Sequence, residues 1–267
     1  MQTSFIGGGV MAEAIFSRAL AGHVLTSSEV CVADPVAERR DYLSKIYSVA
    51  VTDNNLEAVT NAELVVLSVK PQQFPRVATE LKGKLRSHQT LLSIIAGLTV
   101  PSITAGLKHG SVIRVMPNTP SQIGQGMSVW MATSAVPEAT LSTAKALLSV
   151  LGQEWYVADE HYLDMATALS GSGPAYVFAF IESLVEAGVY MGMGREMATA
   201  LVIQTVQGSA QLAKETGESP ALLRERVTSP GGTTAEALRA LESRGFRSII
   251  LEAVVAAHQK ARELGAQ

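Results

Sequence analysis

The feature that most constrains the fold is a glycine-rich segment, Gly7–Ala12, placed between a strand pattern and a helix pattern. Ser4–Ile6 is a short apolar run, and Val10–Leu20 has the spacing of a helix. The segment fits G-x-G-x-x-G/A, in which the glycines permit a tight turn and a close approach to a pyrophosphate. The context of strand, turn and helix predicts a dinucleotide-binding unit. A glycine-rich turn that binds no ligand is the alternative.

Strand and helix patterns continue to alternate up to about Asp159. Alternation of this kind is typical of βαβ units and a parallel sheet. The predicted strands after the first are Glu29–Ala33, Val49–Thr52, Leu64–Val69, Leu91–Ile95, Val112–Met116 and Glu154–Val157, and the predicted helices are Pro35–Lys45, Pro71–Leu81 and Glu138–Leu151.

From His161 onward the patterns predict helices alone. One begins near Pro174, and the others are Met197–Lys214, Pro220–Val227, Thr234–Arg244 and Phe246–Leu264. We therefore expect an α/β protein with a Rossmann-like dinucleotide-binding domain over residues 1–159 and an all-α domain over residues 160–267. Several of these helices are apolar on more than one side, so we expect them to be buried against a second subunit. A self-contained helical domain is the alternative.

Composition excludes several classes of function. The net charge of −3 and the dispersed charges do not resemble a nucleic-acid binder. The single cysteine, Cys31, and the absence of a signal-peptide pattern at the N-terminus favour a cytoplasmic protein. Glu182 and Glu186 interrupt the most apolar long segment, which argues against a membrane span. The five histidines have no metal-ligand spacing, so we expect no metal site.

Several loops follow the carboxyl ends of the predicted strands, where ligands bind in open α/β sheets. They include Ser68–Pro71 and Met116–Pro120. Asp34 ends the second predicted strand and is placed to hold a ribose 2′-hydroxyl, which favours NADH. Arg39 and Arg40 follow within about one helical turn and could instead bind a 2′-phosphate. The choice between NADH and NADPH is therefore open.

Two loops in the second half have the composition of ligand-binding or capping turns. Thr228–Thr234 contains one proline and two glycines before a predicted helix. Thr233 and Glu236 fit a capping box, and the N–H groups of a helix start suit a small carboxylate. Leu169–Tyr176 is rich in serine and glycine and could contact a ligand or cap a helix. A plain turn is the alternative for each.

No nucleophile elbow, phosphate-binding lysine motif or acid pair is present in the sequence. A nucleotide site without such groups indicates that the cofactor carries the chemistry. The simplest reaction of this kind is hydride transfer to a substrate that is already electrophilic.

The chain closely resembles pyrroline-5-carboxylate reductases over essentially its whole length. In the second half, the resemblance rests on the segments Leu169–Tyr176, Thr228–Thr234, Leu241-Glu242 and Gly245-Phe246-Arg247. In the first half, it rests on Gly7–Ala12, Val69–Gln72 and Met116–Pro120. It implies reduction of L-1-pyrroline-5-carboxylate to L-proline with NADPH or NADH, the last step of proline biosynthesis. It also implies a homodimer formed through the C-terminal helices, and dimers that often assemble into decamers.

The resemblance also implies which residues form the site. For the reduction of a cyclic imine we hypothesise that Thr234 hydrogen-bonds the ring nitrogen, directly or as part of a proton path, and that the N–H groups of Gly231 to Thr233 bind the carboxylate. A helix cap alone is the alternative for Thr234. Many members that use NADPH have a small polar or basic residue in place of Asp34. The expected substrate contacts are Ser229, Gly231, Gly232, Thr233 and Thr234, and the expected cofactor contacts, which add Ile6 and Asp34 to those that the resemblance implies, are Ile6, Gly7, Gly8, Gly9, Val10, Met11, Ala12, Asp34, Asn55, Ser68, Val69, Lys70, Pro71 and Asn118.

Two other functions fit the same two-domain plan. One is another NAD(P)-dependent dehydrogenase that acts on a different imine or on a β-hydroxyacid. A β-hydroxyacid enzyme would be expected to have a catalytic lysine near the start of the long helix, where this chain has Ser170, Ser172 and Tyr176. The other is a nucleotide-sensing protein without turnover. The intact loops Gly7–Gly9 and Ser229–Thr234 argue against that function.

Overall fold

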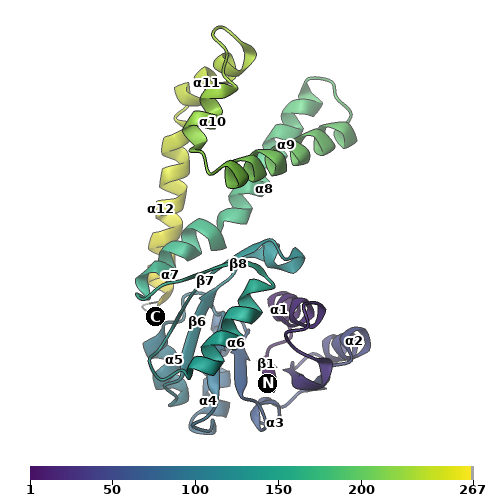
Figure 1. Cartoon of the computed structure of the whole chain (residues 1–267), viewed down its shortest axis with the longest axis vertical. Coiled ribbons are helices and arrows are strands. Elements are labelled where there is room, and N and C mark those ends of the chain that lie inside the picture. Colours follow the sequence, from purple (N-terminus) through teal and green to yellow (C-terminus); the bar gives the residue numbers. More distant parts are fainter. Residues whose placement is uncertain (266–267) are drawn as a thin grey trace. The chain divides into compact units, whose positions relative to one another are not determined.

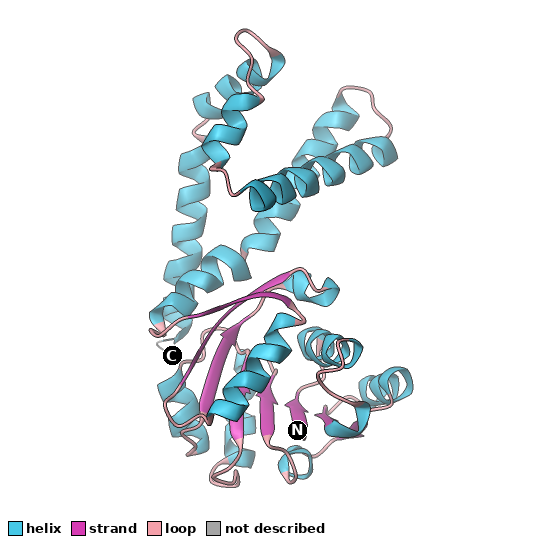
Figure 2. Ribbon diagram, viewed as in Figure 1, coloured by secondary structure: helices cyan, strands magenta, loops and turns pink. Residues whose placement is uncertain are grey.

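The computed structural model describes residues 1–265 and contains two compact units. The first unit comprises residues 1–172 together with the chain from residue 257, and the second comprises residues 173–256. Figures 1 and 2 show that all the strands belong to the first unit, whereas the second is built from helices. The predicted α/β class and the helical C-terminal region are therefore confirmed.

The first unit is built on an eight-stranded sheet in the order β3-β2-β1-β4-β5-β6-β7-β8. The pairs are parallel except for β6 and β7, which are antiparallel. The order of the first six strands is that of the doubly wound dinucleotide-binding fold. The strands are β1 (Thr3–Ile6), β2 (Val30–Ala33), β3 (Ala50–Thr52), β4 (Leu64–Leu67), β5 (Thr90–Ser93), β6 (Val112–Met116), β7 (Gly126–Ala132) and β8 (Gly152–Tyr156).

Helices cover both faces of this sheet. One apolar core includes side chains of α1, α2 and α6, and the other includes side chains of α3, α4 and α5. The helices of this unit are α1 (Val10–Ala21), α2 (Ala37–Tyr47), α3 (Asn55–Val59), α4 (Phe74–Leu81), α5 (Val100–Leu107), α6 (Glu138–Ser149) and α7 (His161–Ala166).

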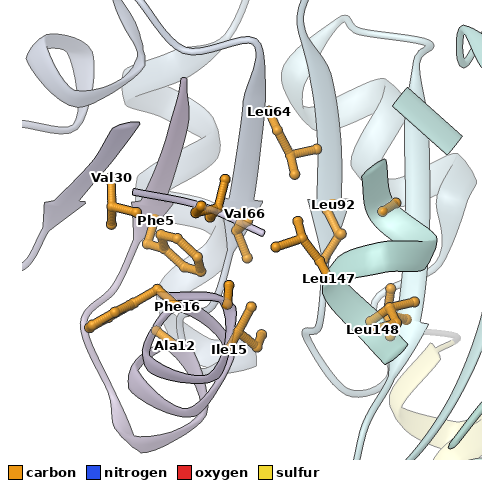
Figure 3. Close-up of a cluster of buried hydrophobic side chains, with 14 of the residues drawn as sticks. Phe5, Ala12, Ile15, Phe16, Val30, Leu64, Val66, Leu92, Leu147 and Leu148 are labelled. Carbon is orange, nitrogen blue, oxygen red and sulfur yellow. The ribbon is translucent and has the colours of Figure 1, made fainter. Parts of the chain in front are cut away.

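Alternate residues of the central strands supply the two cores. Phe5 of β1 belongs to the core with α1, whereas its neighbour Ile6 belongs to the opposite core. Figure 3 shows Phe16 of α1 close to Phe5, and their rings are 5.4 Å apart in an edge-to-face arrangement. Ala12 is fully buried in the same core. A small residue at this position lets α1 approach the sheet closely.

The sequence patterns did not reveal β7, which lies between β6 and β8. Its buried positions include Gly126 and Ser128, while Met127 and Val129 on the opposite face are only partly buried. Trp130 is the third buried position. The hydropathy alternation that normally indicates a strand is therefore hidden over the first half of β7, because Gly126 and Ser128 occupy its first two inward positions. The short helices α3 and α5 were also not predicted.

The helices of the second unit expose many large apolar side chains, including Tyr190, Leu251 and Ile249. Immediately before this unit, Thr167–Gly171 forms a π-helical turn closed by a hydrogen bond from Ser172 N to Thr167 O. The remaining helices are α8 (Gly173–Tyr190), α9 (Arg195–Thr216), α10 (Pro220–Arg226), α11 (Thr233–Ser243) and α12 (Phe246–Gly265), the last of which enters the first unit at residue 257.

Candidate functional site

The turn after β1 requires glycine at its first position. Gly7 has φ +96°, a value that L-residues rarely adopt. A Cβ atom on Gly7 would lie 2.9 Å from Val69 Cγ1 and 3.0 Å from Ser68 O. Ser68 Oγ donates to the carbonyl of Gly7 at 2.8 Å. The loop after β4 therefore supports the turn after β1, and the two segments lie side by side at the carboxyl ends of these central strands.

The start of α1 is open to a ligand. Gly9 is the N-cap residue of α1 and provides no side-chain cap, so the first N–H groups of the helix lack side-chain partners. A Cβ atom on Gly9 would meet no atom within 4 Å. Both Gly9 and Val10 are exposed. Open space in front of unpaired N–H groups and the positive end of the helix dipole suits a pyrophosphate.

Asp34 lies directly after β2, beside the glycine loop. Its Oδ2 accepts the N–H of Gly8 at 2.8 Å, and its Oδ1 accepts the N–H of Val36 at 2.9 Å. A carboxylate has about four acceptor sites, so two remain for a hydroxyl donor. Arg40 lies against the backbone here: its Nη1 donates to the Asp34 carbonyl at 2.8 Å, and its Nη2 is 3.9 Å from Asp53 Oδ2.

Arg39 is bound to the glycine loop and to the first turn of α1. Its Nε donates to the carbonyl of Gly8, and its Nη2 donates to Glu13 Oε2, both at 2.5 Å. Glu13 Oε1 also accepts the hydroxyls of Tyr42 and Tyr47 at 3.1 and 2.7 Å. Burial opposes ionisation of Glu13, but the hydrogen bonds from Tyr47 and Arg39 outweigh it and lower the pKa of Glu13. Burial and the bond to Glu13 raise the pKa of Tyr47 to about 12.

The other expected cofactor residues occupy separate positions in the first unit. Lys70 is exposed at the end of the loop after β4, before a 3-10 turn that begins at Pro71. Asn55 donates from Nδ2 to Glu80 Oε2 of α4 at 2.6 Å. Asn118 joins two segments, since its Nδ2 donates to Ser170 O at 3.1 Å and its Oδ1 accepts the N–H of Met127 at 2.9 Å.

The expected substrate loop lies in the second unit and leads into α11. Gly231 has φ +68°, and the N–H of Gly232 donates to Ser229 O at 3.1 Å, which closes the turn. Gly232 is extended and is the N-cap residue, so α11 begins at Thr233. The first N–H groups of this helix, those of Thr233, Thr234 and Ala235, have no side-chain cap.

The capping box expected at this helix is wrong, and the helix begins at Thr233, one residue before its predicted start at Thr234. Thr233 lies inside the first turn rather than at the N-cap position, because the extended residue before the helix is Gly232. Glu236 does not reach back to the N-cap. Its carboxylate oxygen Oε2 instead accepts hydrogen bonds from Nε and Nη2 of Arg239, at 3.0 and 2.8 Å.

The structure therefore brings some of the expected cofactor-binding residues together. At the carboxyl ends of β1, β2 and β4, Gly8 is hydrogen-bonded to Asp34, Gly7 is hydrogen-bonded to Ser68, and Val69 lies beside Gly7. Glu13 and the two tyrosines that bind it were missed by the sequence analysis. Their partners are 26 to 34 residues away along the chain, so no local motif connects them. Among residues 1–265, no group of three His, Cys, Asp or Glu side chains is placed to hold a metal ion.

Two family models match the chain. Residues 160–264 match the family described as pyrroline-5-carboxylate reductase dimerisation. Residues 2–97 match a family described as NADP oxidoreductase, coenzyme F420-dependent.

Comparison with known proteins gives full-length matches. The chain is 44% identical over 265 residues to a pyrroline-5-carboxylate reductase of Synechocystis sp., covering 99% of this chain and 98% of that protein. It is 39% identical to the Pseudomonas aeruginosa reductase, covering 99% and 97%. The crystal structure of the Plasmodium falciparum reductase with NADP bound has a TM-score of 0.91 at 30% identity, covering 99% and 98%. The Coxiella burnetii reductase has a TM-score of 0.89 at 36% identity, covering 98% of each chain.

Proposed function

The chain belongs to the pyrroline-5-carboxylate reductase family, and we propose that it reduces L-1-pyrroline-5-carboxylate to L-proline, the last step of proline biosynthesis. The observation that carries this proposal is the match to these reductases over the full length of the chain. Within the matched residues, the glycine loop of the first unit leads into an uncapped helix start, and so does the loop Ser229–Gly232 of the second unit. The cofactor is NADH or NADPH, and when bound it supplies the hydride to the imine carbon.

The residues after β1 and β4 fit a dinucleotide. The tight turn at Gly7, the open space at Gly9 and the uncapped start of α1 together fit the pyrophosphate. The carboxylate of Asp34 fits a ribose hydroxyl. We propose that Ser68 to Pro71 and Asn118 border the same cofactor, and that Asn55 contributes to its adenosine end.

The start of α11 is proposed to bind the substrate carboxylate. The N–H groups of Thr233, Thr234 and Ala235 meet the requirements for binding an anion, since they lie in the first turn and have no side-chain cap. The N–H of Gly232 is used by the turn, so Gly231 and Gly232 shape the loop through their backbone conformation. The positive end of the helix dipole adds to the attraction.

Thr234 is proposed to act at the ring nitrogen of the imine. Hydride addition to the imine carbon leaves a nitrogen that must carry a proton, and protonation before transfer makes that carbon a better acceptor. A threonine hydroxyl can donate one hydrogen bond and accept two, so it can hold the proton at this nitrogen. No lysine is required, because the substrate already contains the C=N bond.

Thr234→Ala is expected to lower kcat/KM for pyrroline-5-carboxylate by about 10- to 100-fold, the size of one good hydrogen bond in the transition state. Steady-state kinetics with saturating cofactor measure this change. Thr234→Ser keeps the hydroxyl and should retain most of the activity. Unchanged kinetics in the alanine variant would remove Thr234 from the mechanism.

Thr233→Pro is expected to raise KM for pyrroline-5-carboxylate by about tenfold or more, because proline removes one anion-binding N–H group. Proline is well tolerated at the first position of a helix, and Gly232 already has the extended conformation that precedes proline. Thr233→Ala is the matched control, since it removes the hydroxyl and keeps the N–H group. If the two variants have the same KM, the carboxylate does not bind this N–H group.

A homo-oligomer is proposed to bury the apolar surface of the second unit. Phe178, Leu201 and Leu251 are exposed on three different helices. The segment His161–Tyr190 has the length and mean hydropathy of a membrane span. Glu182 and Glu186 lie within it, so we propose that a second subunit, rather than lipid, covers its apolar residues. The dimer is proposed to assemble further into a decamer, as the resemblance implies.

Leu251→Glu is expected to shift the protein to the monomer at micromolar concentration. Its side chain is 65% exposed in the single chain, and a charge buried without a partner in a subunit interface is costly. Sedimentation velocity measures the change. Glu252→Gln, at the next position of the same helix, is a control that changes one charge on an exposed residue. A Leu251→Glu protein with the wild-type assembly would place the interface elsewhere.

The remaining parts of the proposal concern domain limits and cellular location. The match to the dimerisation family begins at residue 160, which supports a cofactor domain over 1–159 and a substrate-binding and dimerisation domain over 160–267. The single cysteine, Cys31, supports a location in the cytoplasm.

A further inference from the structure

We propose that this chain selects NADH over NADPH, and that Glu13 is a positioning residue for this selection because it holds Arg39 on the glycine loop. The inference rests on the proposed cofactor site and specifies its ligand. It is carried by the contacts around Asp34, Arg39 and Arg40. The sequence alone left both arginines as possible partners of a 2′-phosphate.

The first step concerns Asp34. In this fold the residue after β2 meets the ribose hydroxyls of the adenosine half. The carboxylate of Asp34 is fixed by N–H groups on both of its oxygens, from Gly8 and Val36. It therefore cannot swing aside without breaking two hydrogen bonds. A 2′-hydroxyl can donate to its remaining acceptor sites, whereas a 2′-phosphate would place a second anion beside it.

The second step concerns Arg39. Its guanidinium contacts the Gly8 carbonyl and Glu13, and it lies over the Tyr42 ring at 5.2 Å from the centroid. Glu13 is itself fixed by the hydroxyls of Tyr42 and Tyr47. Movement of Arg39 toward a 2′-phosphate would break its own contacts and leave Glu13 partly buried without its cation. The contacts of Glu13 thus oppose the use of Arg39 as a phosphate ligand.

The third step concerns the local charge. Arg40 lies against the carbonyl of Asp34 and near Asp53. The charged groups that take part in these contacts are the carboxylates of Asp34, Glu13 and Asp53 and the guanidinium groups of Arg39 and Arg40, and their net charge is −1. A phosphate ester adds a charge of about −1.5 to −2 at neutral pH, and no excess positive charge is present to offset it.

Equilibrium binding of the two cofactors tests the selection without any turnover. Titration of the full chain with NADH and with NADPH, followed by the fluorescence of the bound cofactor, gives both dissociation constants. We expect NADH to bind at least about tenfold more tightly than NADPH. In Asp34→Ser, which removes the anion and keeps a hydrogen-bonding group, the ratio should fall by about tenfold or more.

Glu13→Gln tests the positioning role. The variant removes the charge that holds Arg39 and keeps the shape of the side chain. NADPH should bind about fivefold more tightly than to the wild type, and NADH should change by less than about twofold. Glu38→Gln is the matched control, since it removes one charge from an exposed residue of α2 and should leave both constants unchanged.

Several outcomes would overturn the inference. Equal or tighter binding of NADPH by the wild type, or an unchanged ratio in Asp34→Ser, would contradict the selection. Equal changes for both cofactors in Glu13→Gln would assign Glu13 a purely structural role. These results are distinct from failure of the proposed function. Selective NADH binding without reduction of pyrroline-5-carboxylate would refute that function, whereas reduction with equal binding of both cofactors would refute only the selection.

Discussion

Replacing Gly9 with valine is expected to weaken NADH binding by at least about 100-fold, because the backbone could no longer approach the pyrophosphate closely enough for its charge-assisted hydrogen bonds. The space at Gly9 is open, and its φ of −66° and ψ of −179° are accessible to valine. The apo protein should therefore fold normally. Isothermal titration of the variant with NADH measures the loss of affinity.

Gly110→Val provides the matched control for this change. Gly110 also has no atom within 4 Å of an added Cβ, and it lies just before β6, at the amino end of a strand. This variant should bind NADH as the wild type does. Thermal unfolding of the Gly9 variant within a few degrees of the wild type would show that the fold is kept. Wild-type affinity in Gly9→Val would mean that the pyrophosphate does not lie at the start of α1.

Arg114→Met is expected to lower the free energy of unfolding by about 2–4 kcal/mol, because it leaves two partly buried carboxylates without their cation. Arg114 lies on β6 with a side chain only 4% exposed. Its Nη1 is 2.7 Å from Glu160 Oε1 and its Nη2 is 3.2 Å from Asp164 Oδ1. The partners are 25% and 19% exposed, which keeps the expected loss below that of a fully buried pair.

Urea denaturation, with comparison of the midpoint and the slope, measures this loss. A triple variant, Arg114→Met with Glu160→Gln and Asp164→Asn, also removes the two carboxylates that the single variant leaves unpaired, and it should recover much of the stability. The backbone N–H of Val100 donates to Glu160 Oε1 at 2.7 Å, and the glutamine oxygen can still accept it. A single variant within about 0.5 kcal/mol of the wild type would show that the cluster contributes little, as exposed ion pairs do.

The parts of the fold that depend on local sequence could be predicted. The tight turn at Gly7 and the helix after it follow from residues adjacent in the chain, and the apolar strands β4 and β5 are continuous runs. By contrast, β7 begins with small residues, Gly126 and Ser128, at its first two inward positions and gave no pattern. Its antiparallel pairing with β6 is a tertiary property that no local signal carries.

In the candidate site, too, the features set by local sequence could be predicted and those set by long-range contacts could not. The loop before α11 could be located from its glycines and proline, but the N-cap position depends on the backbone of Gly232, and this excluded the expected capping box. Asn55 was expected only from the family resemblance, whereas Asn118 belongs to a loop that the strand pattern also indicated. The hydrogen bonds of both residues join segments distant in sequence. The contacts between Glu13 and Arg39 are also long-range, so the structure was needed to find them.

The most direct test of the central claim is reduction of pyrroline-5-carboxylate by the purified chain. The loss of NADH or NADPH absorbance and the L-proline formed should be measured in the same reaction, beside a panel of other cyclic imines and keto acids. We predict one L-proline formed for each reduced cofactor oxidised, with pyrroline-5-carboxylate the best substrate of the panel. Binding of the cofactor without oxidation by pyrroline-5-carboxylate, or a clear preference for another substrate, would contradict the assigned reaction.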